Sequence, residues 1–294
     1  MAVLEFEVVD VFTTTPFVGN PLAVVLGAEA LTTAQMQAVA NEFNLSETAF
    51  PLVPSAEEVA RGVDYRLRIF TATAELPFAG HPSIGTAWLL TRRGVVRPGR
   101  VVQACGAGDL PLVVSPDGGR VQLTGGTPTL GSGLDGDTVL AAVGLGADHL
   151  AGPSVLRAGT GLEFAYLFVR PDALALAAPD PHAQCRLTES SGVMGVSVVA
   201  WSDAGLARCR VFAGDIAEDP ATGSAALGLA VAAVAHGLLP GEGRSSFELR
   251  QGVEMGRPST LHVEVEASGG RAVQARVAGD VVRVSQGRIA APPH

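Results

Sequence analysis

Cysteine is scarce in this chain of 294 residues, and its three cysteines are widely spaced. Such spacing forms neither a disulfide framework nor a set of metal ligands, so we expect no metal site. Runs of basic residues are also missing, and the net charge is −9. Because a nucleic-acid-binding surface needs clustered positive charge, nucleic acid is not an expected partner. A small anionic substrate remains compatible, since a helix N-terminus can bind a carboxylate whatever the net charge.

Long apolar stretches are missing too. The longest apolar run, Ala225 to Ala235, has about the length of a buried helix and is too short to cross a bilayer. Residues 1–10 alternate apolar and acidic side chains as a strand does, without the basic start and apolar stretch of a signal peptide. We therefore expect a soluble, cytoplasmic protein with no membrane partner.

Apolar residues make up 47% of the chain and charged residues 17%, which allows a large core in two ordinary domains or one large domain. Strand-like stretches dominate both halves of the chain. They are Leu4–Val11, Tyr65–Phe70, Val101–Ala104, Leu110–Ser115, Ala165–Val169, Val196–Ala200, Arg208–Phe212, Leu261–Val265 and Val281–Val284. The helix-like stretches are Thr33–Phe43, Ser83–Arg92, Thr138–Val143 and Thr222–Ala235.

An internal repeat relates the two halves. Arg68-Ile69-Phe70 is matched by Arg210-Val211-Phe212, each at the end of an apolar strand. After a short loop, His81-Pro-Ser-Ile-Gly-Thr-Ala87 aligns without gaps to Asp219-Pro-Ala-Thr-Gly-Ser-Ala225. The repeat predicts that each half uses the same strand–loop–helix unit.

Both copies lead into apolar, alanine-rich helices, and a helix that is apolar all round must be enclosed on every side. Each half is therefore predicted to be a curved, mainly antiparallel sheet wrapped around a central helix, which is an α+β fold. The expected N-terminal domain is 1–125 and the expected C-terminal domain is 130–275. A strand near 276–290 can return to the first domain, and the glycine- and threonine-rich residues 125–136 are the expected linker.

The repeat also predicts a binding site. Proline in the first helical turn with small residues after it leaves backbone N–H groups free to hold a carboxylate. If pseudo-symmetry turns the two halves face to face, His81 and Asp219 lie opposite each other in a cleft between the domains. Gly80, Gly223 and Ser224 are then the candidate substrate-binding residues.

Glu47 is the candidate acid–base residue. It follows the predicted helix Thr33–Phe43 within small and apolar neighbours, and burial of a carboxylate raises its pKa toward the range of a general acid–base group. A capping or surface glutamate is the alternative interpretation. His81 can act as a proton relay or cap a helix, and Asp219 can serve as a helix N-cap as well as a ligand. Ser224 can bond a carboxylate or simply allow close packing.

At these residues the sequence resembles the phenazine-biosynthesis PhzF-like family, and the matching motifs follow the family's order along almost the whole chain. The motifs are Asp10-Val-Phe-Thr, Phe17-Val-Gly-Asn-Pro-Leu22, Asn44-Leu-Ser-Glu-Thr-Ala-Phe50, Glu75-Leu-Pro-Phe-Ala-Gly-His81, Glu218-Asp-Pro-Ala-Thr-Gly-Ser-Ala225 and Gln251-Gly-Val-Glu-Met-Gly-Arg-Pro-Ser259.

The resemblance implies the fold of diaminopimelate epimerase, a homodimer, and an isomerase that needs no metal or organic cofactor. It implies that Glu47 shuttles a proton, while His81, Asp219 and Ser224 position the substrate and assist proton transfer. Epimerases and racemases of the wider superfamily carry cysteines where this chain has His81 and Asp219. In addition, Pro82-Ser-Ile-Gly85 departs from the family's more usual Ala-Thr run, which can alter the pocket.

The leading interpretation is therefore a cofactor-independent isomerase acting on a small carboxylate, with Glu47, His81 and Asp219 as the catalytic residues. A racemase or epimerase of a small amino or hydroxy acid is the second interpretation, and it requires His81 or Asp219 as a second base. A non-catalytic binding or interaction protein on the same scaffold is the third.

Overall fold

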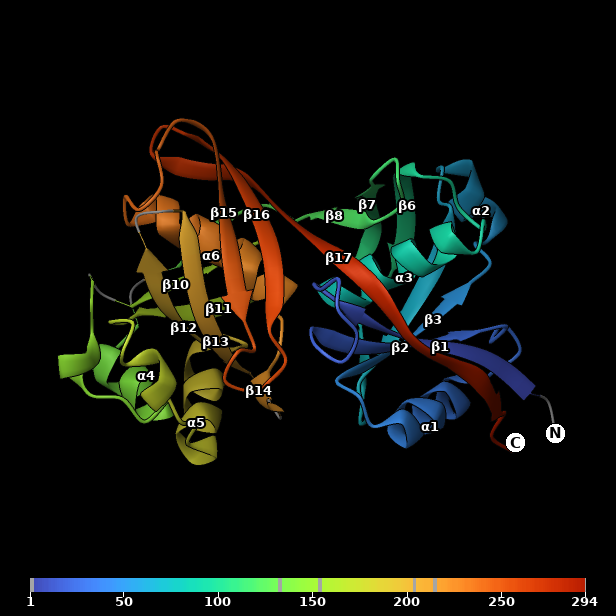
Figure 1. The fold of residues 1–294 in the computed structure, drawn as a ribbon, viewed down its shortest axis with the longest axis horizontal. Helices are drawn as coiled ribbons and strands as arrows, with labels where there is room; N and C mark the ends of the chain where they lie inside the picture. Colours follow the sequence, from blue (N-terminus) through green and yellow to red (C-terminus); the bar gives the residue numbers. More distant parts are fainter. Residues whose placement is uncertain (1–2, 132–133, 153–154, 203–204, 214–215, 294) are drawn as a thin grey trace. The chain divides into compact units, whose positions relative to one another are not determined.

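The computed structural model describes residues 3–131, 134–152, 155–202, 205–213 and 216–293 (Figure 1). The chain divides into two compact units. Unit 1 holds residues 1–123 and 278–294, and unit 2 holds residues 124–277. Each unit combines a mixed sheet with α-helices, so the predicted α+β class is confirmed.

Unit 1 is built on a sheet that closes on itself. Its strands are β1 (Val3–Val11), β2 (Asn20–Leu26), β3 (Glu47–Leu52), β4 (Tyr65–Phe70), β5 (Glu75–Leu76), β6 (Gly99–Cys105), β7 (Gly108–Val114), β8 (Arg120–Thr124) and most of β17 (Arg271–Ala290). Its helices are α1 (Thr33–Phe43), α2 (Ala56–Ala60) and α3 (Gly80–Arg92). Pairing runs from β17 through β1, β2, β3, β4, β6 and β7 to β8, which pairs again with β17.

Unit 2 is also built on a mixed sheet. Its strands are β9 (Thr129–Leu130), β10 (Leu156–Gly159), β11 (Glu163–Phe168), β12 (Gly195–Ser202), β13 (Leu206–Ala213), β14 (Ile216–Asp219), β15 (Gly243–Gln251) and β16 (Ser259–Ser268). Its helices are α4 (Gly136–Ala142), α5 (Pro181–Ser191) and α6 (Gly223–Ala235), with 3-10 turns at Ala147–His149 and Leu174–Leu176. The parallel pairs are β11–β12 and β13–β15, as β2–β3 and β4–β6 are in unit 1.

The internal repeat extends to side-chain contacts. In unit 1, Arg68 on β4 forms an ion pair of 2.7 Å with Glu75 on β5 and lies 5.1 Å from the ring of Phe70. In unit 2, Arg210 on β13 forms an ion pair of 2.7 Å with Glu218 on β14 and lies 5.0 Å from the ring of Phe212. The same arginine therefore ties the strand to the loop that leads into the central helix in each unit.

The two central helices are enclosed, as the sequence predicted. Helix α3 is buried from Gly80 through Leu90, and α6 is buried at Gly223 and from Ala225 through Val234. Alanine and glycine allow the strands to approach such a helix closely. Among the described residues, no helix is long and apolar enough to span a membrane.

Gly85 gives a test of this packing. A Cβ atom at Gly85 would lie 2.7 Å from Leu22 Cδ2 and 2.9 Å from Val11 Cγ2, both in the sheet that surrounds α3. We expect Gly85→Ala to lower the free energy of unfolding by about 1–3 kcal/mol, because the core is overpacked. Urea denaturation measures this change.

The matched control is Gly136→Ala, at the start of α4. A Cβ atom there meets only Val155 Cγ2, at 4.0 Å, which is ordinary contact. The control should be neutral or slightly stabilising, since alanine favours helix more than glycine does. Equal effects of the two substitutions would show that α3 is not packed this closely.

Candidate active site

The start of β2 positions the candidate acid–base residue in unit 1. Helix α1 ends at Asn44, which adopts a left-handed conformation with φ of 48°, and β3 begins three residues later at Glu47. Leu22 of β2 pairs in parallel with Glu47. The hydroxyl of Ser46 donates to the side chain of buried Asn20 at 3.1 Å. Glu47 is therefore held by a strand and is not a capping or free surface residue.

His81 reaches the same place from α3. It is the second residue of the helix, whose N-cap is Ala79, so His81 does not cap the helix. Its Nε2 atom lies 3.4 Å from Glu47 Oε2, and the side chains of His81 and Glu47 are only 5% and 14% exposed. The structure thus brings together two of the three predicted catalytic residues.

The tautomer of His81 follows from its surroundings. The ring bonds the backbone of Pro21, and its Nε2 atom makes no hydrogen bond to any described residue, so Nδ1 is the nitrogen that donates to the Pro21 carbonyl. Burial lowers the pKa of His81 to about 3, although the bond to Pro21 acts in the opposite direction. At neutral pH the imidazole is uncharged, and Nε2, which carries the lone pair, lies 3.4 Å from Glu47 Oε2.

This protonation state predicts how stability depends on pH. In the unfolded chain a histidine has a pKa of about 6.5, whereas in the folded chain the pKa of His81 is about 3. Below pH 6.5 the unfolded chain binds a proton that the folded chain does not, so stability falls as the pH decreases from about 6.5 toward 3.

Between pH 7 and pH 4 the native protein should lose up to about 3 kcal/mol more stability than His81→Gln. Urea denaturation at pH 7, 6, 5 and 4 measures the difference. Parallel stability curves for the two proteins would show that His81 does not stay neutral in the folded state.

Asp219 ends β14 in unit 2, three residues before the N-cap of α6. The N-cap is Thr222, so Asp219 is not the N-cap residue. Asp219 is 8% exposed, and its Oδ2 atom accepts a hydrogen bond of 2.5 Å from the Thr222 hydroxyl. Gly80 and Gly223 are the first residues of α3 and α6, and Ser224 lies in the first turn of α6. Each predicted binding residue is therefore at the N-terminus of a central helix.

The supporting contacts at β2 were not predicted from the sequence. Asn20 and Pro21 belong to the motif Phe17–Leu22, which carried the family resemblance without an assigned role. The signal available in the sequence was an Asn-Pro pair at the start of a strand, where the preceding loop ends. Their bonds to Ser46 and His81 span 26 and 60 positions, so no local pattern could reveal them.

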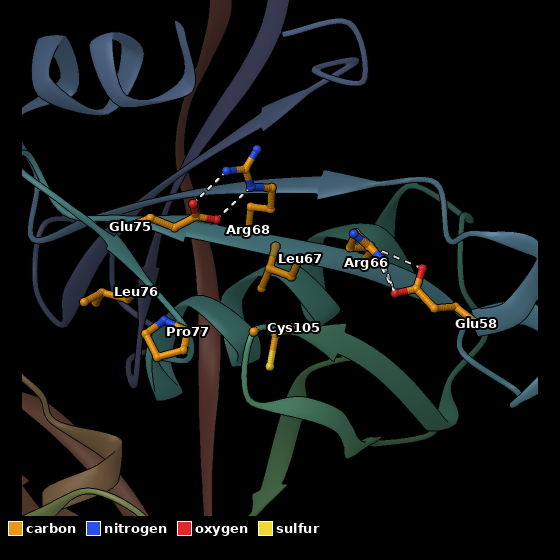
Figure 2. A pocket seen from close by; sticks show the side chains of 9 residues that line it. Glu58, Arg66, Leu67, Arg68, Glu75, Leu76, Pro77 and Cys105 are labelled. Atoms are coloured by element: carbon orange, nitrogen blue, oxygen red, sulfur yellow. Dashed lines mark hydrogen bonds and ion pairs between the residues drawn. The ribbon is translucent and has the colours of Figure 1, made fainter. Parts of the chain in front are cut away.

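A hollow of about 430 Å³ lies elsewhere on unit 1, along β4 and β5 (Figure 2). Its charged groups are paired with one another: Arg66 with Glu58 at 2.6 Å, and Arg68 with Glu75 at 2.7 Å. Neither Glu47 nor His81 lines it. Because its arginines already hold carboxylates, it is a weaker candidate for an anionic substrate than the helix N-termini. In the part of the chain that the structure describes, no cluster of metal-binding side chains occurs.

Comparison with known proteins identifies the family of this chain. The family model described as phenazine biosynthesis-like protein, PhzC-PhzF, matches residues 9–287. The trans-2,3-dihydro-3-hydroxyanthranilate isomerase of Pseudomonas aeruginosa is 34% identical over 291 residues, which cover 97% of this chain and 98% of that protein.

Solved structures show the same fold. A predicted epimerase from Pseudomonas aeruginosa has a TM-score of 0.81 and 30% identity, covering 97% of this chain and 99% of its own. A PhzF-family phenazine biosynthesis protein from Bacillus anthracis has a TM-score of 0.87 at 23% identity, covering 99% of this chain and 100% of its own. The predicted resemblance and fold are confirmed: the chain belongs to the phenazine biosynthesis-like PhzC-PhzF family and is an isomerase.

Proposed function

We propose that this isomerase moves a proton between two carbon atoms of a small carboxylate substrate, with Glu47 as the acid–base group. The observation that carries the proposal is the approach of Glu47 Oε2 to within 3.4 Å of His81 Nε2, with both side chains largely buried. A general base needs such a defined, partly dehydrated position, and an adjacent acceptor helps it to hold the proton that it has removed.

The proposed step balances without an external oxidant or reductant. The Glu47 carboxylate removes a proton from carbon, and the electron pair of the broken C–H bond enters the conjugated system of the substrate. In its protonated form, Glu47 can donate a hydrogen bond to the lone pair of His81 Nε2. The carboxylic acid proton of Glu47 exchanges with solvent, and Glu47 then delivers a proton to a different carbon, which shifts the double bond and regenerates the Glu47 carboxylate.

The proposal gives the helix N-termini the task of holding the substrate carboxylate. The first turn of α3 begins at Gly80 without a side-chain cap, so its backbone N–H groups and the helix dipole favour an anion. We assign the corresponding task in unit 2 to Gly223 and Ser224, and the task of contacting the reacting part of the substrate to Asp219. The binding of the substrate between the two domains, expected from the repeat, stays a prediction.

The first experiment identifies the substrate and the reaction type. The purified protein is incubated with trans-2,3-dihydro-3-hydroxyanthranilate, the substrate named for the relative from Pseudomonas aeruginosa, and with a panel of small unsaturated, amino and hydroxy carboxylates. Proton NMR and optical rotation follow each compound. We expect at least one compound to change the position of its double bond. Conversion of none would contradict the proposal.

Epimerisation is the second candidate, because the 30% identical structure from Pseudomonas aeruginosa is described as a predicted epimerase. Inversion at one carbon requires a base on one face and an acid on the other. The neutral imidazole of His81 has its proton on Nδ1, bonded to Pro21, so His81 has no proton to deliver from Nε2. Loss of optical rotation without a change in double-bond position would favour this second reaction.

The family resemblance also leads us to propose a cytoplasmic homodimer. Sedimentation velocity at micromolar concentration tests the oligomeric state. A species of twice the 30.0 kDa chain mass is expected, and a monomer at all concentrations would contradict this part of the proposal.

A further inference from the structure

The family motif that begins at Gln251 takes no direct part in the proposed proton transfer. Gln251 ends β15, is fully buried, and lies opposite Cys209 in the parallel pair of β13 and β15. A buried amide with this position needs all of its donors and acceptors satisfied. Its partners therefore indicate what it holds in place.

Both ends of the Gln251 amide bind the turn that leads into α6. Nε2 donates to the backbone oxygen of Asp219 at 2.7 Å and to Thr222 Oγ1 at 3.0 Å. Oε1 accepts from the backbone N–H of Thr222 at 3.1 Å and from the thiol of Cys209 at 3.6 Å. If the oxygen and nitrogen of the Gln251 amide were exchanged, its NH₂ group would face the N–H group of Thr222, and both groups are donors. These partners therefore fix the orientation of the amide.

The orientation of this amide sets the direction of the next hydrogen bond. Because Thr222 Oγ1 accepts from Gln251, its own proton is available to be donated, and Asp219 Oδ2 lies 2.5 Å away. The chain of donors thus runs one way, from Gln251 to Thr222 to Asp219. Asp219 Oδ2 must act as an acceptor, which favours the ionised carboxylate.

We propose that Gln251 and Thr222 are positioning residues that hold the Asp219 carboxylate ionised and in one orientation. The inference rests on the proposed function, in which Asp219 contacts the substrate. Neither residue is proposed to touch the reacting atoms. Their effect on the reaction passes through Asp219.

Unit 1 contains a related arrangement that ends differently. Gln103 on β6 is also fully buried, accepts from the Tyr65 hydroxyl at 2.9 Å and donates to the Ser83 hydroxyl at 3.0 Å. Ser83 then donates to the backbone oxygen of Ala79 at 2.9 Å. This series of hydrogen bonds ends on a backbone oxygen, whereas the series in unit 2 ends on a candidate catalytic side chain. The positioning role is therefore specific to Gln251 and Thr222.

Thr222→Val removes the hydroxyl and keeps the shape of the side chain. We expect it to lower kcat by about 10- to 100-fold, the range expected when a reacting group is displaced, with little change in KM. Thr222→Ser keeps the hydroxyl and should restore kcat to within about threefold of the native value. Equal kcat values for Thr222→Val and Thr222→Ser would overturn the inference.

Tyr166→Phe is the matched control for a purely structural loss. The buried Tyr166 hydroxyl donates to the backbone oxygen of Ala225 at 2.7 Å, so it supports the same first turn of α6 without contacting Asp219. We expect it to lower the thermal midpoint about as much as Thr222→Val does, with kcat unchanged. If kcat fell equally in Tyr166→Phe and Thr222→Val, the effect of Thr222 would be explained by loss of structural support alone, without positioning of Asp219.

Gln251→Glu adds a readout that loss of packing would not produce. An ionised carboxyl group at this position can only accept, so it would draw the Thr222 proton away from Asp219, whereas a protonated one can still donate. Burial raises the pKa of the adjacent Cys209 thiol, and three carboxylates near position 251 raise it further: Asp219, Glu218 and Glu254. Arg210 is also nearby and forms an ion pair with Glu218. The kcat of this variant should fall as pH rises, through an ionisation that the native enzyme lacks. If kcat depended on pH in the same way in the variant and the native protein, the proposed direction of the hydrogen bonds from Gln251 through Thr222 to Asp219 would be contradicted.

Crystal structures of native protein and Thr222→Val separate this inference from the proposed function. We expect the Asp219 side chain to leave its native orientation in the variant, whether or not a substrate has been found. An unmoved Asp219 would overturn the inference alone. Failure of the native protein to transfer a proton on any compound would overturn the proposed function, and the crystal structures would still test the positioning role.

Discussion

Replacing Glu47 by glutamine is expected to lower kcat by about 10²- to 10⁴-fold, the range found when a general acid–base group is removed. Glutamine has nearly the same shape as glutamate, so the strand register with Leu22 and the packing near His81 should persist. The amide cannot accept a proton from carbon at neutral pH. KM should change little, because the proposed carboxylate contacts come from helix N-termini.

Two controls make the Glu47→Gln result specific. The thermal midpoint should stay close to the native value, because glutamine keeps the length and shape of the glutamate side chain at the start of β3. Glu47→Asp keeps a carboxyl group but shortens the side chain by one methylene group, which moves the carboxyl group away from the reacting carbon. Its kcat should therefore lie between those of native protein and Glu47→Gln. A kcat of Glu47→Gln within about threefold of the native value would remove Glu47 from the mechanism.

Replacing His81 by phenylalanine should lower kcat by about 10²-fold or more. The phenyl ring fills most of the space of the imidazole but loses both nitrogens. Glu47 then loses the neighbouring acceptor 3.4 Å away, and the Pro21 carbonyl loses its donor. Because the imidazole is neutral, His81 does not titrate between pH 5 and 8. The dependence of kcat on pH in this range should therefore have the same shape in the variant as in the native protein.

His149→Phe is the matched control for this substitution. The Nδ1 atom of His149 accepts a hydrogen bond of 3.0 Å from the backbone N–H of Gly146, at a partly exposed turn of unit 2. Its replacement also removes an imidazole bonded to the backbone, so it should lower stability slightly and leave kcat unchanged. If His81→Phe were as active as His149→Phe, the contact between His81 and Glu47 would have no catalytic role.

Much of the fold could be predicted because its signals are local. The predicted helix Thr33–Phe43 and strand Tyr65–Phe70 match α1 and β4 residue by residue. The apolar composition of α6 predicted its burial correctly. Helix α3 begins at Gly80, three residues before the predicted start at Ser83, because proline is tolerated in a first helical turn and does not mark the boundary.

Helix α5 was not predicted, although its sequence contains the usual boundary signals. Asp180 caps it, Pro181 is its first residue and Gly192 ends it in a left-handed conformation. The helix is polar over much of its length, with buried residues at Ala183, Gln184 and Leu187. A prediction that depends on apolar content therefore misses a helix whose capping residues define it.

The candidate site could be predicted at the level of residues but not of contacts. Repeat and motif together selected Glu47, His81 and Asp219. The contacts that hold them come from Pro21, Thr222 and Gln251, and those of Pro21 and Gln251 join residues that lie tens of positions apart in the sequence. The neutral state of His81 likewise depends on burial, which no local pattern specifies.

Incorporation of solvent deuterium tests the central claim most directly. Native protein and Glu47→Gln are incubated in heavy water with the substrate identified by the NMR screen, and product and recovered substrate are examined by NMR and mass spectrometry. We predict that native protein places deuterium at the carbon atoms between which the proton moves, and that Glu47→Gln places almost none. Equal incorporation by both proteins would contradict the assignment of proton transfer to Glu47.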